Sequence, residues 1–75
     1  INICGVLVAV NPTNFNQLSD YLMNIEGCEI IESKDNTKLA LVIEDTDKQS
    51  AYDIMEQIKN HSFVLSITLI NHFFE

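Results

Sequence analysis

The chain has 75 residues, 47% of them hydrophobic, with only two glycines and one proline. A chain of this length forms one domain, residues 1–75, and buries only about 60% of the surface that its unfolded form exposes. Eleven acidic residues against four lysines, with no arginine, give a net charge of −7. This balance argues against nucleic acid and anionic membranes as partners and favours a cationic one, although an acidic surface also keeps a small protein soluble.

The first half of the chain predicts a strand, a helix and a hairpin. Residues 3–10 (ICGVLVAV) are apolar on both faces and rich in β-branched side chains, which is typical of a central strand. Asn11-Pro12 ends this strand, and a helix that Gly27 terminates follows. Its apolar stripe consists of Phe15, Leu18, Leu22 and Ile25. Strands at 28–32 and 39–44 then flank a polar turn, SKDNTK, in which Asp35 and Asn36 accommodate a tight backbone.

The second half predicts a helix and a last strand. Thr46 and Gln49 stand at capping-box spacing, so a helix is expected over 47–60. Its apolar stripe consists of Ala51, Ile54, Met55 and Ile58. Residues 63–70 alternate between apolar and hydroxyl side chains, which indicates a half-solvated strand.

The resulting order, βαββαβ, predicts an α+β fold of the ferredoxin-like type. Two right-handed crossovers joined by a hairpin give a four-stranded antiparallel sheet with strand order 4-1-3-2. Both helices are expected on one face of this sheet. The other face then has no helical cover.

The alternation of side chains along each strand assigns residues to the two faces of the sheet. The side chains expected to meet the helices are Cys4, Val6, Val8, Cys28, Ile30, Leu39, Leu41, Ile43, Leu65, Ile67 and Leu69. Those expected on the uncovered face are Gly5, Leu7, Ala9, Glu29, Ile31, Ala40, Val42, Glu44, Ser66, Thr68 and Ile70. Because bare apolar surface often marks a binding site, all of the uncovered set except Gly5 form the candidate site.

The two cysteines are interpreted as core residues. Cys28 has Glu26 and Glu29 as neighbours, whereas a reactive thiol needs a positive neighbour, and neither cysteine has metal-ligand spacing. The third strand separates the strands that carry Cys4 and Cys28. At two strand spacings they lie about 9 to 10 Å apart, beyond the ~7 Å Cα limit for a disulfide.

No catalytic centre, metal site or cofactor is predicted. His61, in the turn after the second helix, can interact with the helix C-terminus, and His72 follows the last strand. Neither has a nucleophile or ligand partner in the sequence. The remaining carboxylates are scattered over loops and helix surfaces.

Several functions known for ferredoxin-like folds do not fit these residues. RNA-recognition modules need aromatic platforms on the first and third strands, where this chain has Leu, Val and Ala. Copper chaperones need two cysteines in the first loop, which here reads NPTNF, and acylphosphatases need an arginine. A small regulatory domain that binds amino acids remains an alternative. Such a domain holds its ligand largely through backbone atoms at a dimer interface, so its site leaves only a weak trace in the sequence.

The apolar run from Val6 to Val10 is far shorter than the roughly 20 residues of a membrane span. No basic stretch precedes it to form a signal peptide. We therefore expect a cytoplasmic protein, with the reservation that the sequence begins at Ile1 and residues can be missing at its ends.

Four segments taken together resemble a known family. ICGVLVAV, IEGCEII, KLALVIED and VLSITLINH are similar, in order and spacing, to the NapD-type chaperones of periplasmic nitrate reductase. The most specific element is the triplet Gly27-Cys28-Glu29 at the head of the second strand. The resemblance covers nearly the whole chain.

This resemblance implies a non-enzymatic cytoplasmic chaperone that binds the twin-arginine signal peptide of the nitrate reductase catalytic subunit. Holding the peptide would delay export until the molybdenum cofactor is inserted. The residues agree, because a peptide with adjacent cations and then an apolar stretch suits carboxylates that border a bare apolar face. A helical peptide would lie across the sheet and an extended one would add to the edge strand 63–70; we favour the helix.

Overall fold

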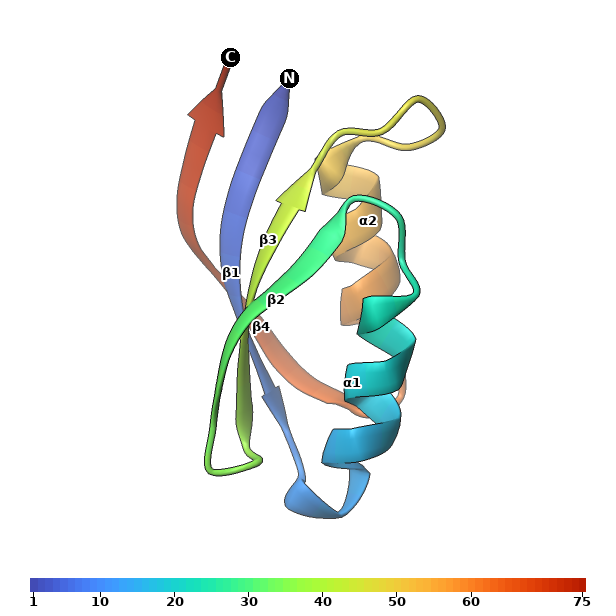
Figure 1. Cartoon of the computed structure of the whole chain (residues 1–75), viewed down its shortest axis with the longest axis vertical. Helices are drawn as coiled ribbons and strands as arrows, with labels where there is room; N and C mark the ends of the chain where they lie inside the picture. Colours follow the sequence, from blue (N-terminus) through green and yellow to red (C-terminus); the bar gives the residue numbers. More distant parts are fainter.

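A computed structural model describes all residues, 1–75. The elements are β1 (Asn2–Val10), the 3₁₀ turn η1 (Pro12–Asn14), α1 (Phe15–Met23), β2 (Cys28–Lys34), β3 (Lys38–Glu44), α2 (Ala51–Lys59) and β4 (Val64–Phe74). The strands form one antiparallel sheet in the order β2-β3-β1-β4. Both helices lie on the same side of it (Figure 1). The predicted ferredoxin-like fold and strand order are confirmed.

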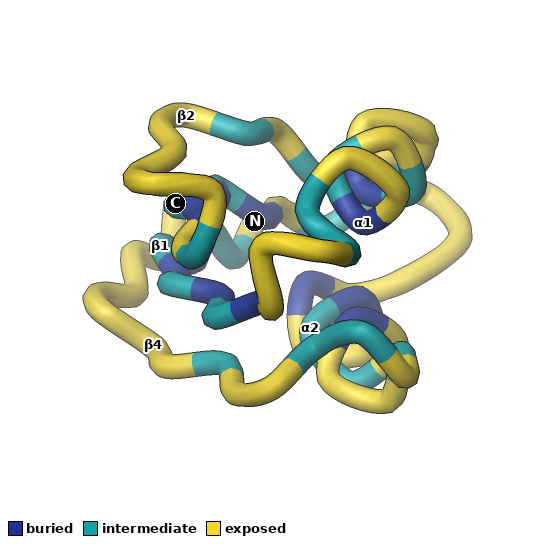
Figure 2. Tube along the Cα trace, turned by 90° about the horizontal axis from the view of Figure 1, so that it is seen from below, coloured by how far each residue is buried: buried dark blue, intermediate teal, exposed yellow.

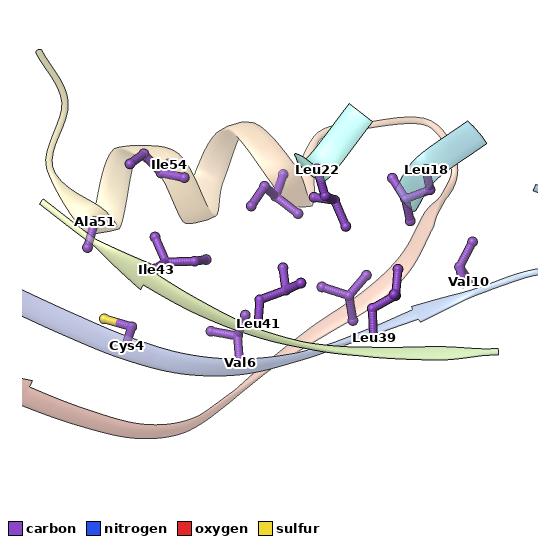
Figure 3. Packing of buried hydrophobic residues seen from close by; sticks show 12 residues of the cluster. Cys4, Val6, Val10, Leu18, Leu22, Leu39, Leu41, Ile43, Ala51 and Ile54 are labelled. Atoms are coloured by element: carbon purple, nitrogen blue, oxygen red, sulfur yellow. The ribbon is translucent and has the colours of Figure 1, made fainter. Parts of the chain in front are cut away.

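The core lies between the sheet and the helices. Its buried residues are all apolar, and they are Cys4, Val6, Val8, Val10, Leu18, Leu22, Leu39, Leu41, Ile43, Ala51, Ile54 and Ile58. Strand side chains point toward α1 and α2, and helix side chains point back between them (Figure 3). Cys28 and Ile30 of β2 are half-buried against this cluster. The inward assignments in β1, β2 and β3 are therefore confirmed.

The first helix is shorter than predicted. It ends at Met23 rather than at Gly27, and the Nδ2 of Asn24 donates to the Asp20 carbonyl at 2.8 Å. Ile25 nevertheless packs against the core from the turn that follows. Gly27 lies in the turn just before β2 with φ +88°, and a Cβ there would lie 2.7 Å from the Glu44 carbonyl oxygen. Both its backbone conformation and its close contact with β3 therefore require glycine.

The second helix begins at Ala51, later than the predicted 47. Ser50 is the N-cap, and its Oγ accepts a hydrogen bond of 3.1 Å from the Asp53 amide. Thr46 instead closes a local turn, because its Oγ1 accepts from the Gln49 amide at 3.0 Å. A threonine with a polar residue three positions later can thus cap a turn as well as a helix.

Asp45 ties this helix to the sheet. One of its carboxylate oxygens accepts from the Ala51 amide at 2.7 Å, and the other accepts from the Asn2 amide at 2.7 Å. These hydrogen bonds, of which the one from the Ala51 amide contributes most, hold the pKa of the Asp45 carboxyl below its usual value. The start of β1, the end of β3 and the first turn of α2 are therefore joined at one side chain.

The last strand departs most from prediction. It runs to Phe74 rather than ending at residue 70, so His72 lies inside it, with Nε2 2.8 Å from the Asn2 Oδ1. Its register against β1 shifts between Ala9 and Val10 and again between Gly5 and Val6.

These shifts change which side chains of β4 meet the helices. Ile67 is half-buried against the core as predicted, but Leu65 lies at the first shift and is 68% exposed. Leu69 lies opposite Val6 and lines a groove beside Met55, yet remains 54% exposed. The prediction of a uniformly helix-facing set was therefore wrong for Leu65 and overstated the burial of Leu69. A β-bulge adds a residue on one strand only and so interrupts the alternation.

Candidate functional site

The uncovered face of the sheet is organised in rows of cross-strand neighbours. One row runs through Glu29, Val42, Gly5 and Asn71, the next through Glu32, Ala40, Leu7 and Thr68, and the last through Lys34, Lys38, Ala9 and Ser66. A shorter row joins Glu44, Ile3 and Phe73. Seen from below the molecule, this face lies on the side of the sheet away from the helices (Figure 2). We call it the open face.

Half-buried apolar side chains form the floor of the open face. They come from the two central strands and are Leu7, Ala9, Ala40 and Val42, each at a predicted position. Because they are neither fully buried nor fully exposed, they are available for contact without being needed to fill the core. Such apolar surface is typical of binding sites.

Two predicted carboxylates lie together at one end of this floor. Glu29 is next to Val42 across β2 and β3, and Glu44 ends β3. Both are exposed, and both line a hollow of about 220 Å³ with Gly27, Cys28 and Val42. The structure therefore gathers two acidic groups from different strands around one apolar side chain.

The other end of the floor has mixed charges. A second hollow, of about 250 Å³, is lined by Leu7 and Ala40 and bordered by Glu32, Lys34 and Lys38. Sequence reasoning missed these three charged residues. The register of β2 shifts between Ile30 and Glu32, so Glu32 takes the place opposite Ala40. Ile31 lies at this shift and is 56% exposed.

The β4 side of the open face is polar near its middle. Thr68 lies opposite Leu7 and Ser66 opposite Ala9, as the alternation predicts. Ile70 lies at the second register shift and is 61% exposed, while Asn71 takes the place opposite Gly5. A Cβ on Gly5 would lie 2.5 Å from the Asn71 Oδ1, so this asparagine covers the glycine. Neither Asn71 nor Phe73 could be assigned to the open face without knowing where the bulge falls.

The cysteines pack on the opposite, helix-facing side of the sheet, although Cys28 also borders the acidic hollow at the edge of β2. Cys4 and Cys28 both pair with Ile43, one from each side, and both thiols are free. Burial raises the pKa of Cys28 to about 11, and burial together with the charge of Asp45 raises that of Cys4. Both therefore remain protonated at neutral pH, in agreement with a packing role.

The histidines take part in local contacts. The His61 ring packs against Tyr21 with centroids 4.4 Å apart, and its Nδ1 accepts from the Phe63 amide at 3.0 Å. The His61 side chain therefore packs against α1 and accepts a hydrogen bond within the turn that leads into β4.

No group of three or more His, Cys, Asp or Glu side chains is placed to hold a metal ion. None of the helices is long and apolar enough to cross a membrane.

Comparison with known proteins identifies the family. The family model described as NapD protein matches residues 1–75. The chain belongs to the NapD family. Its relatives include the proteins named Chaperone NapD of Escherichia coli K12 and Shigella flexneri, each 24% identical over 71 residues that cover 93% of this chain and 82% of the relative.

A solved structure agrees with this assignment. The solution structure of the E. coli Tat proofreading chaperone protein NapD superimposes with a TM-score of 0.82 at 26% identity, covering 97% of this chain and 78% of that one. The resemblance seen in the sequence is therefore confirmed. The comparisons favour a chaperone and give no support to a small regulatory domain.

Proposed function

We propose that this chain is a cytoplasmic, non-enzymatic chaperone that binds the twin-arginine signal peptide of the periplasmic nitrate reductase catalytic subunit. By holding the peptide it keeps the precursor from the export machinery until the molybdenum cofactor has been inserted. Membership of the NapD family and the likeness to a Tat proofreading chaperone support this proposal. The protein acts as a monomer, with one peptide on each open face.

The observation that carries the proposal is the pairing of charge and apolar surface on the open face. Glu29 and Glu44 line one hollow, and the apolar floor begins beside them at Val42. A twin-arginine signal has the matching order, two adjacent cations and then an apolar stretch. Arginine recognises carboxylates through several hydrogen bonds, and an apolar stretch gains from leaving water on the floor.

A helical peptide lying across the open face agrees better with these residues than a strand added to β4. Edge addition would rely on backbone hydrogen bonds along Val64–Phe74, a segment without any carboxylate to meet the arginines. The open face offers carboxylates and apolar side chains together. Its ten predicted contact residues are Leu7, Ala9, Glu29, Ile31, Ala40, Val42, Glu44, Ser66, Thr68 and Ile70.

Calorimetric titration with the signal peptide tests the proposal. We expect one-to-one binding that weakens when both arginines of the peptide are replaced by glutamine, because the carboxylates then lose their cationic partners. A scrambled peptide of the same composition is the control. Equal binding of the native and glutamine peptides would contradict the proposed site.

The same preparation tests the alternative function and the monomeric state. A small regulatory domain would form stable dimers and gain thermal stability from an amino acid but not from the peptide. We expect the reverse, a monomer in light scattering that is stabilised by the peptide alone, since a ligand that binds only the folded state raises its stability.

A further inference from the structure

The open face has different charges at its two ends. Along β3 it runs from Lys38 at the hairpin to Glu44 at the other end, and both side chains are exposed. The acidic hollow at the Glu44 end has no lysine in its lining. In Figure 1 the hairpin joining β2 and β3 lies at the bottom, and the acidic end lies at the top beside the two termini.

The hairpin end is nearly neutral rather than acidic. Lys34 lies opposite Lys38, and the hollow beside them also contains Glu32. Asp35 in the turn balances the remaining positive charge. The open face is therefore negative at one end only, and its two lysines are both at the other end.

The length of the face sets how much peptide it can hold. Glu44 and Lys38 are the two ends of β3. At about 3.3 Å per residue they lie roughly 20 Å apart along the strand. An α-helix rises 1.5 Å per residue, so a helix of about 13 residues spans this distance.

A bound helix has its own polarity. Its N-terminal end carries partial positive charge from free N–H groups, and its C-terminal end carries partial negative charge from free carbonyls. In a twin-arginine signal the arginines precede the apolar stretch, so side-chain charge and helix dipole are positive at the same end. In one orientation both meet carboxylates at Glu29 and Glu44, and the free carbonyls meet Lys34 and Lys38. In the reverse orientation the arginines face the lysines and the carbonyls face the carboxylates.

We propose that the signal peptide binds in a single direction, with its arginine end in the acidic hollow and its C-terminal end at the β2–β3 hairpin. This inference rests on the proposed function and adds the orientation of the bound helix. The apolar stretch then lies over Val42, Ala40 and Leu7. The rest of the precursor leaves the chaperone at the hairpin end, away from Gly27.

Paramagnetic relaxation by labelled peptides tests the direction. The native signal peptide is made with a nitroxide at its N-terminal end or at the C-terminal end of its apolar stretch. Each peptide is added to the full-length ¹⁵N-labelled chaperone. We expect the N-terminal label to abolish amide signals at Gly27 and Glu29, and the C-terminal label to abolish those at Asp35 and Asn36.

The outcomes separate this inference from the function on which it rests. If the peptides bind but the pattern is reversed, or each label affects both ends equally, the single direction is wrong and the function stands. If neither labelled nor unlabelled peptide binds, the proposed function fails and the direction fails with it.

A charge variant tests the part played by the lysines. In Lys34→Glu with Lys38→Glu both ends of the face are acidic, so we expect the C-terminal label to lose its preference and to affect Gly27 as well. The matched control is Lys48→Glu with Lys59→Glu, which makes the same change in net charge away from the open face. A pattern in the first variant identical to that of the native protein would show that the lysines do not set the direction.

Discussion

The two faces of the sheet use the same kinds of side chain for different purposes. On the helix-facing side, Leu41 is only 2% exposed and belongs to a core without any polar side chain. On the open face, Leu7 is half-buried beside charged residues. The two leucines lie on neighbouring strands, because Leu41 pairs with Val6 and Leu7 with Ala40. In the proposed function, stability therefore depends on one side of the sheet and peptide binding on the other.

Truncation of the buried leucine should have the largest effect on folding. Leu41→Ala is expected to lower the free energy of unfolding by about 2–5 kcal/mol, because it leaves a cavity in a small core. Urea unfolding followed by circular dichroism measures it. Leu7→Ala is the matched control and should cost about 1 kcal/mol or less. Equal losses in the free energy of unfolding would show that Leu7 contributes to the stability of the fold as much as the buried Leu41.

The half-buried leucine should dominate peptide binding. Leu7→Ser is expected to weaken binding by about 1.5–3 kcal/mol, roughly 10- to 150-fold, because the peptide loses an apolar contact. The loss should be similar at low and high salt, as measured by calorimetric titration. The matched control is Met23→Ser, which changes an exposed apolar residue of α1 away from the open face and should leave the affinity unchanged. An unchanged affinity in Leu7→Ser would place the peptide elsewhere.

Cys28 and Glu29 are consecutive residues of β2 and lie on opposite faces of the sheet, so variants at these two positions test packing and binding separately. Cys28→Ala should cost about 1 kcal/mol of stability and leave peptide binding unchanged, because the thiol packs against the core. With a pKa of about 11, the native thiol should also react with iodoacetamide more slowly than free cysteine at pH 8. A variant that folds normally yet loses the peptide would move Cys28 into the site.

Removal of one carboxylate should have the smallest effect. Glu29→Gln is expected to weaken peptide binding by about 0.2–1 kcal/mol at low salt, because an exposed ion pair is screened by water. This loss of affinity should come mainly from slower association and should disappear at high salt. Stopped-flow mixing measures both. Glu56→Gln on α2 is the control of equal charge. Equal losses at both salt concentrations would contradict an electrostatic role for Glu29.

The sequence predicted the central strands better than the edges. In β1 and β3 strict alternation sorted every residue from Cys4 to Ala9 and from Leu39 to Glu44 onto the observed face. In β2 and β4 the register shifts, and there prediction missed Glu32 and Asn71 and misassigned Leu65. Central strands pair on both sides, whereas an edge strand has one free side and can take up an extra residue.

The sequence located both helices but not their ends. The apolar stripes located both helices, but the N-terminus of α2 was placed at the turn that Thr46 closes rather than at Ser50. Gly27 was expected to end α1, but α1 ends at Met23 and Gly27, with a positive φ of +88°, lies in the turn just before β2. Side chains that cap a helix also cap an isolated turn, so only the surrounding packing decides between them.

By itself the sequence determined the order of the elements, the ferredoxin-like fold and the apolar content of both faces, because periodicity and turn residues are local properties. It also determined the acidic balance that favours a cationic partner. Only the tertiary structure decided that Glu29 and Glu44 line one hollow, that Glu32, Lys34 and Lys38 border the other, and that the face is negative at one end. These depend on strand pairing and on the positions of bulges, which bring together residues that no local pattern connects.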